Sequence, residues 1–311
     1  MSNIRLPRRD FLKLSAAAGG AMLSPALAMS ADSQGVPVID THLHCFAGAN
    51  DSRFPYHSRA PYRPERVAPP EHLLKLMVGA GVDYAIVVHP EPYQDDHRYL
   101  EHCLLVGKRE LKGTCLFFAD RPNSVQRMHD LVKRNEGRIV AARIHAYAPE
   151  RLPPFGKPEL RTFWKGIADL GLAVQLHFEP RYAPGFDALI REFSKTPVII
   201  DHLGRPLQGS PEEYEHVLGW SELPNTIVKI SSLPDQNRYP HRDIAPFVRE
   251  LGKRFGPERL IYGGGYSETA TAASYREYRE RVRGYFADFS TADQAKILGG
   301  NAARLFGFPV S

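Results

Sequence analysis

Two histidines separated by one residue, His42 and His44, follow a short apolar segment near the start of the chain. In an extended backbone, side chains two positions apart point to the same side, so both imidazoles can face one point. Neutral imidazole is a good ligand for zinc and similar cations, and three such nitrogens with an open water position make a catalytic site. The pair therefore indicates one edge of a metal or catalytic site.

Two further histidines, His177 and His202, end apolar segments that are typical of buried strands. A single histidine is more often a hydrogen-bonded core residue than a ligand. Four histidines that share the same position relative to their strands favour a common site. We expect His42, His44 and His177 to hold a divalent metal, with zinc as the first candidate, and a metal-free site stays open. His177 and His202 are the expected catalytic groups.

Arginines accompany the histidines. Arg143 lies within a predicted strand and Arg205 follows His202. Planar guanidinium groups favour bidentate binding of carboxylates, so we expect Arg143 and Arg205 to bind a small anionic substrate, such as a lactone or cyclic acid. Solvated surface charge is an equally good explanation for four arginines in the loop after the first strand: Arg53, Arg59, Arg63 and Arg66. Only a secondary role is expected for two more histidines near strand ends: His89 and His145.

The elements that must position these side chains alternate along the chain. Short β-branched or apolar segments predict eight strands, at residues 36–41, 84–89, 113–118, 139–145, 173–178, 198–202, 226–231 and 260–263. Several are continuous apolar runs, which a parallel sheet buried on both faces requires. Segments of helical period lie between and after them, near residues 70–80, 95–109, 122–135, 159–170, 185–195, 211–219, 242–255 and 271–287.

This alternation predicts an α/β protein with one (β/α)₈ TIM-barrel domain over residues 36–308. A doubly wound open sheet is the alternative, but no G-x-G-x-x-G phosphate turn follows the first strand. In a barrel the carboxyl ends of the strands converge on the active site, so histidines far apart in the sequence meet in space. The irregular stretch 46–69 is rich in Pro, Arg and Tyr, and it should lie over the barrel mouth as a lid or binding loop.

The first 28 residues have the pattern of an export signal. Arg8 and Arg9 form a twin-arginine pair, a small and apolar run follows over residues 14–27, and Ala26 and Ala28 provide the small side chains that a signal peptidase reads. The run is too short for a spanning helix. We expect a twin-arginine signal over residues 1–28 and a periplasmic mature chain without a membrane span.

The composition is typical of a soluble globular protein, with 43% hydrophobic and 24% charged residues. The formal charge of +5 comes from 40 basic and 35 acidic residues, and removing four basic residues and one acidic residue with the signal leaves +2 (36 minus 34). We see no basic stripe suited to nucleic acid. The sequence does not reveal the oligomeric state, and a homo-oligomer stays open. Three cysteines without CxxC spacing are expected as buried thiols: Cys45, Cys103 and Cys115.

Over nearly the whole mature chain, the sequence resembles the amidohydrolase-related branch (amidohydrolase 2) of the metal-dependent hydrolase superfamily. Within that branch it is most similar to lactonases that open pyrone dicarboxylates and related lactones. The resemblance rests on residues 39–44, 54–56, 175–177, 201–205 and 297–306, of which the last segment is the most distinctive. It implies a TIM-barrel hydrolase, and Tyr56 in the first loop is expected to bind substrate.

The end of the eighth strand departs from the pattern of this family. Its members carry an Asp there, within a W-G-x-D-W-P-like segment, which binds the metal or takes a proton from the attacking water. Alignment on Gly263 puts Gly265 at that position, and glycine has no side chain to do either. Three explanations stay open: Glu268 or Asp235 substitutes, His202 or His177 is the base, or catalysis has been lost and a binding pocket remains.

These observations favour a hydrolase that adds water to a small carboxylated lactone or a related cyclic ester or amide. A bound cation or the histidines themselves would stabilise the developing oxyanion. A metal-dependent decarboxylase is the alternative, because that chemistry also occurs in this branch of the superfamily. A catalytically inactive binding protein is the third hypothesis.

Overall fold

The computed structural model describes residues 35–234 and 242–310. The predicted signal over residues 1–28 and the candidate base Asp235 lie outside the described residues. Among the helices that are described, none is both long and apolar enough to cross a membrane. The three cysteines are buried free thiols, as predicted: Cys45, Cys103 and Cys115.

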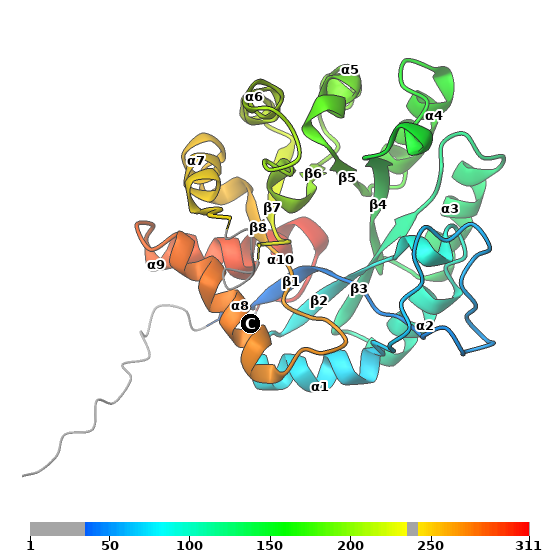
Figure 1. Cartoon of the computed structure of the whole chain (residues 1–311), viewed down its shortest axis with the longest axis horizontal. Helices are drawn as coiled ribbons and strands as arrows, with labels where there is room; N and C mark the ends of the chain where they lie inside the picture. Colours follow the sequence, from blue (N-terminus) through cyan, green and yellow to red (C-terminus); the bar gives the residue numbers. More distant parts are fainter. Residues whose placement is uncertain (1–34, 235–241, 311) are drawn as a thin grey trace, which may run out of the picture. The chain divides into compact units, whose positions relative to one another are not determined.

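Eight parallel strands form one sheet in the order β1 to β8, so each strand pairs with the next one in the sequence. The strands are β1 (Ile39–Leu43), β2 (Tyr84–Val88), β3 (Leu111–Leu116), β4 (Ile139–Ala146), β5 (Ala173–Phe178), β6 (Val198–Ile200), β7 (Thr226–Ile230) and β8 (Leu260–Tyr262). The sheet curves so that its two edges meet, where Thr41 Oγ1 on β1 donates to the Tyr262 carbonyl on β8 (Figure 1). This confirms the predicted (β/α)₈ barrel and excludes the open sheet.

Helices surround the strands, and one lies in each predicted interval (Figure 1). They are α1 (Pro70–Ala80), α2 (Arg98–Gly107), α3 (Ser124–Arg134), α4 (Pro158–Asp169), α5 (Asp187–Glu192), α6 (Pro211–Gly219), α7 (Ala245–Phe255) and α8 (Ala272–Tyr285). Three begin with proline, whose fixed φ suits the first helical position and whose missing N–H is not needed there. Two short helices, α9 (Thr291–Ala295) and α10 (Asn301–Phe306), flank a π-helical turn and were not predicted.

The predicted strand ends need correction where the backbone turns sharply. We expected the sixth strand to run to His202, but β6 ends at Ile200. The cause lies in the next residues, because His202, Leu203 and Arg205 all have left-handed backbone angles, with φ of 54°, 62° and 56°. A non-glycine residue in this region costs of the order of 1–3 kcal/mol, and such strain is found mainly at functional sites.

Side chains that point into the barrel form layers. On β4 and β5, alternate residues face inward, so Ala141 and Ala173 lie deep while Arg143 and Gln175 lie one step higher. The deep layer is apolar and packs against Phe306 of α10 and the C-terminal segment. The layer above it is polar, and it carries the histidines at the strand ends.

Candidate active site

A cavity of about 630 Å³ opens at the carboxyl ends of the strands, within the usual size range of small-molecule sites. All four predicted strand-end histidines line it, together with both predicted arginines and Glu268: His42, His44, His177, His202, Arg143 and Arg205. The loop between β1 and α1 adds Phe46, Pro61, Tyr62 and Ala68 to the lining. This loop therefore forms part of the cavity wall, in agreement with its expected position over the barrel mouth.

The imidazole rings lie close together. The ring centroids are 5.2 Å apart for His42 and His44, 4.5 Å for His42 and His202, and 5.1 Å for His177 and His202. Burial lowers the pKa of all four rings, to about 3 for His44 and His202, and the charge of Arg143 lowers those of His44, His177 and His202 further. The four imidazoles are therefore neutral at pH 7.

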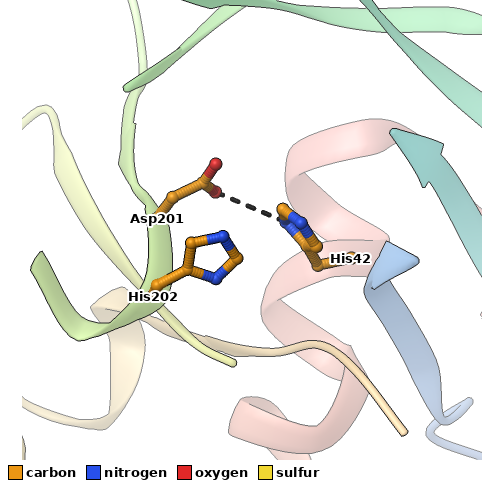
Figure 2. A group of neighbouring side chains, drawn as sticks. All are labelled: His42, Asp201 and His202. Atoms are coloured by element: carbon orange, nitrogen blue, oxygen red, sulfur yellow. Dashed lines mark ion pairs between the residues drawn. The ribbon is translucent and has the colours of Figure 1, made fainter. Parts of the chain in front are cut away.

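A buried carboxylate, Asp201, lies beneath the histidines and was not predicted from the sequence. Its Oδ2 accepts hydrogen bonds from Arg143 Nε at 3.0 Å and from Gln175 Nε2 at 2.9 Å. Its Oδ1 lies 3.6 Å from His42 Nδ1, and Figure 2 shows the two side chains beside His202. Burial alone would raise the pKa of Asp201, but Lys229 and Arg143 together hold it well below 3.8.

Lys229 on β7 is the second group that sequence reasoning missed. Its side chain is 1% exposed, and its Nζ lies 3.2 Å from Asp201 Oδ1 and 3.4 Å from His42 Nδ1. The signal in the sequence was a lysine inside the strand T-I-V-K-I, because a lysine within an apolar strand needs a buried acidic partner.

The donors for a metal ion are present, but the charges around them do not fit one. His42, Asp201 and His202 offer ligand atoms that all lie within 4.8 Å of one another, so the group could hold a metal by geometry. However, Lys229 and Arg143 already pair with the single carboxylate, at 3.2 and 2.9 Å. A divalent cation would add two positive charges beside two existing ones in a buried site. Only His42 belongs to both this group and the predicted ligand set.

The other predicted ligands bond to different groups. His44 Nδ1 lies 2.7 Å from the Val88 carbonyl, so this nitrogen carries the proton. His177 Nδ1 lies 2.7 Å from Arg143 Nη2, so it accepts and the proton of this ring lies on Nε2. Arg205 Nη1 is 3.4 Å from that Nε2. With the proton on Nε2, the N–H groups of His177 and Arg205 face each other, and both need an acceptor such as a ligand oxygen.

The chain around Gly265 has no room for a side chain. A Cβ built on Gly265 would come 2.7 Å from Tyr275 Cδ2, and its φ is 109°. A Cβ on Gly264 would meet the Tyr278 hydroxyl at 2.9 Å, and one on Gly263 would meet His42 Cβ at 2.8 Å. The absence of a carboxylate at position 265 is thus tied to the conformation of the local backbone. Exchanging this one side chain would not restore the carboxylate.

Several predicted contributors lie elsewhere. Tyr56 does not line the cavity, and its hydroxyl donates to the Pro64 carbonyl within the loop. His89 is fully buried, and its Nε2 bonds to the Gln94 carbonyl. The candidate base Glu268 is exposed at the cavity rim. None of the four loop arginines lines the cavity: Arg53, Arg59, Arg63 and Arg66.

A second charged group also lines the cavity. Glu91, just after β2, accepts a hydrogen bond from the Tyr147 hydroxyl and one from Arg151 Nη1 at 3.0 Å. His145, for which only a secondary role was expected, lies beside Glu91. Sequence reasoning missed Glu91, although it follows the carboxyl end of a predicted strand, where a site residue belongs.

Comparison with known proteins gives matches over most of the chain. The profile of a family described as Amidohydrolase matches residues 39–308. A 4-sulfomuconolactone hydrolase of Rhizobium radiobacter is 27% identical over 287 residues, which cover 86% of this chain and 89% of that protein. An L-fucono-1,5-lactonase of Burkholderia ambifaria is 26% identical over 257 residues, covering 76% and 84%.

Solved structures share the fold. A putative 2-pyrone-4,6-dicarboxylic acid hydrolase from Pseudomonas putida superposes with a TM-score of 0.71 at 22% identity, covering 89% of this chain and 99% of that one. At this level of identity the similarity supports the barrel fold alone.

Proposed function

The chain belongs to the amidohydrolase family, as a hydrolase related to lactonases, and from that premise we propose that it hydrolyses a small lactone that carries an anionic group. The reaction would add water to the ring carbonyl and open the C–O bond, giving a hydroxy acid. The sulfomuconolactone hydrolase among its relatives acts, by its name, on a lactone of this kind.

The observation that carries this proposal is the pair of donors from His177 and Arg205. His177 Nε2 and Arg205 Nη1 lie 3.4 Å apart, and because both carry protons neither can accept from the other; both residues line the cavity. Two donors in such a position suit an oxygen that becomes negative, as the carbonyl oxygen does when water adds to the ring. The Arg143 hydrogen bond fixes the tautomer of His177 that carries its proton on Nε2, the nitrogen beside Arg205.

The balance of charge favours an anionic substrate. Around the floor of the cavity, Arg143, Arg205 and Lys229 provide three cations against the one carboxylate of Asp201. The negative charge of Glu91 is already neutralised by Arg151. A substrate carboxylate or sulfonate would reduce this excess of positive charge in a partly desolvated site.

Metal chemistry is not needed for these steps. Members of this superfamily commonly use a divalent metal, and the sequence predicts a zinc ion at the histidines. In this chain, Lys229 and Arg143 already pair with Asp201. We therefore propose that these two side chains provide the positive charge beneath the histidines, and no step of the reaction is assigned to a metal.

The test is hydrolysis by the purified protein of three lactones: 4-sulfomuconolactone, 2-pyrone-4,6-dicarboxylate and L-fucono-1,5-lactone. Acid release at constant pH is followed with and without added zinc, and His177→Gln is the negative control. We expect turnover of at least one anionic lactone and slower turnover of the neutral one. Release of carbon dioxide without acid would indicate the decarboxylase instead. Thermal stabilisation by a lactone that remains intact would indicate a binding protein.

We also propose that the protein is exported to the periplasm by the twin-arginine route. The support is the order of Arg8 and Arg9, the apolar run and the small residues before position 29. Changing Arg8 and Arg9 to lysine keeps the charge but removes the pattern. This double variant should stay in the cytoplasm on fractionation, and equal export of both proteins would refute the proposal.

A further inference from the structure

Two buried groups on one wall of the cavity, Glu91 and His145, have no role in the reaction described so far. Their residues are 5% and 8% exposed, and both line the cavity. His145 lies on β4 next to His177 on β5, with ring centroids 5.1 Å apart. His145 is therefore close to the donors expected to hold the carbonyl oxygen.

The imidazole of His145 is unusual in its hydrogen bonding. Within residues 35–234 and 242–310, neither of its ring nitrogens has a hydrogen-bond partner, although both are buried. A buried imidazole without partners is costly unless another molecule completes its bonds. The nearest polar group is Glu91, whose Oε1 lies 3.6 Å from His145 Nδ1.

Glu91 is held firmly in place for such a contact. The Tyr147 hydroxyl donates to its Oε2, and Arg151 Nη1 donates to its Oε1. Burial opposes ionisation of Glu91, but the neighbouring His145, the hydrogen bond from Tyr147 and the charge of Arg151 outweigh burial and lower its pKa to about 2. Glu91 is thus an ionised carboxylate, paired with Arg151 and held in place beside an imidazole.

The other cavity histidines have different neighbours. His42 faces Lys229, and His202 and His177 face Arg143, so a proton taken up by any of these rings would meet a nearby cation. The Nδ1–H of His44 donates to the uncharged Val88 carbonyl.

Burial lowers the pKa of His145, and the positive charge of Arg143 lowers it further, so the ring is neutral. Among the five rings, it alone lies next to Glu91, whose carboxylate pairs with Arg151 rather than with Lys229 or Arg143. The charge of Asp201 raises the pKa of His145 from further away. The rings of His177 and Tyr147 lie beside the imidazole of His145.

We propose that His145, oriented by Glu91, is the general base that replaces the missing carboxylate at Gly265. This inference rests on the proposed lactone hydrolysis. With its Nδ1 proton directed toward Glu91 Oε1, 3.6 Å away, the ring keeps a lone pair on Nε2, which has no partner among the described residues. As the water oxygen bonds to the carbonyl carbon, its proton moves to Nε2 and the carbonyl electron pair moves to oxygen. When the ring C–O bond breaks, the proton passes from Nε2 to the leaving oxygen.

Kinetics provide the first test, with the anionic lactone that the protein turns over fastest. His145→Gln should lower kcat about 10²- to 10⁴-fold, the usual contribution of a general base, with little change in KM. Added imidazole should restore part of the activity of His145→Ala. Glu91→Gln should lower kcat less, also with little change in KM. Glu150→Gln, an exposed glutamate beside Arg151, is the matched control and should behave as the unaltered protein.

The competing base is Glu268, and its variant decides between the two. If Glu268→Gln lost activity while His145→Gln and His145→Ala kept theirs, the proposal would be wrong. Melting temperatures of all variants separate loss of catalysis from loss of folding.

A second test needs no turnover, so it separates this inference from the proposed function. Nitrogen-15 NMR of histidine-labelled protein distinguishes the two neutral tautomers, and the spectrum of His145→Gln assigns the resonances of His145. We expect the proton on Nδ1, and a change in this signal in Glu91→Gln. A proton on Nε2 in the unaltered protein would overturn the dyad even if lactones were hydrolysed. A correct tautomer with no hydrolysis would leave the dyad intact and refute the function.

Discussion

Asp201 shows how one side chain can organise a whole site. It accepts from Arg143 and Gln175 through Oδ2, while Oδ1 lies against Lys229 and His42. These partners come from four different strands, β4, β5, β7 and β1. A buried carboxylate is stable only when its charge is matched. Lys229 and Arg143 therefore match the charge of Asp201 in the buried site.

Replacing Lys229 by alanine should convert the site toward metal binding. The change removes the ammonium 3.2 Å from Asp201 Oδ1 and leaves the ligand atoms of His42, Asp201 and His202 within 4.8 Å of one another. Without zinc, we expect the variant to lose about 3–5 kcal/mol of unfolding free energy, as when one partner of a buried pair is removed. Elemental analysis after incubation with zinc and desalting should find more zinc in Lys229→Ala than in the unaltered protein.

The matched control is Lys112→Ala. Lys112 donates to the Phe306 carbonyl at the other end of the barrel, so its removal should leave the zinc content unchanged. One equivalent of tightly held zinc in the unaltered protein would contradict this account of Lys229.

Replacing Arg205 should lower kcat more than it raises KM. Its guanidinium provides one of two donors for the developing oxyanion, and loss of one such donor typically costs about 10²- to 10³-fold in kcat. We expect a loss of this size for Arg205→Gln with anionic lactones, with partial recovery in Arg205→Lys, which keeps a charge but not the planar fork. Steady-state kinetics check this, and the exposed Arg181→Gln is the control. A rise in KM at constant kcat would assign Arg205 to binding alone.

At the level of elements, the sequence predicted the barrel well because its signals are local. Continuous apolar runs mark the strands, and each histidine of the site follows such a run. What could not be predicted depends on contacts between strands. Asp201, just after β6, meets Lys229 on β7, and the lysine indicates a buried acidic partner without showing which residue it is. The turn at His202 was also hidden, because its left-handed backbone is imposed by the fold and not by a glycine.

The segment after β8 gives a test of backbone strain. Gly265→Ala should be destabilising by about 1–3 kcal/mol or more, because φ is 109° and the new Cβ would lie 2.7 Å from Tyr275. Gly284→Ala is the control within the neighbouring helix α8, where nothing lies within 4 Å of the added Cβ. This second change should stabilise the protein by up to about 1 kcal/mol. Urea unfolding measures both, and equal effects would show that position 265 tolerates a side chain.

At the scale of the whole barrel, Asp40 holds together the place where the sheet closes. Its Oδ1 accepts the backbone N–H groups of His42 and of Gly264 beyond β8, and its Oδ2 accepts from the Tyr275 hydroxyl on α8. One carboxyl group thus joins the first strand, the last strand and the last large helix. Burial raises its pKa from 3.8 to about 7, and these hydrogen bonds only partly oppose that rise.

The raised pKa predicts how stability changes with pH. Between about pH 4 and 7, folded Asp40 keeps a proton that the unfolded chain has lost, so ionisation opposes folding and stability falls as pH rises through this window. Asp40→Asn resembles the protonated form, because its oxygen can accept both backbone N–H groups while its amide faces a Tyr275 hydroxyl turned to accept. Relative to the unaltered protein, this variant should therefore gain unfolding free energy as the pH rises from 4 to 7, by at most about 4 kcal/mol. Urea unfolding across this range measures the difference, with Asp83→Asn, an exposed carboxylate that also accepts a backbone N–H from beside β1, as the control. Parallel pH profiles for Asp40→Asn and the unaltered protein would mean that Asp40 is already ionised in the folded barrel at pH 4, and that its three donors outweigh its burial.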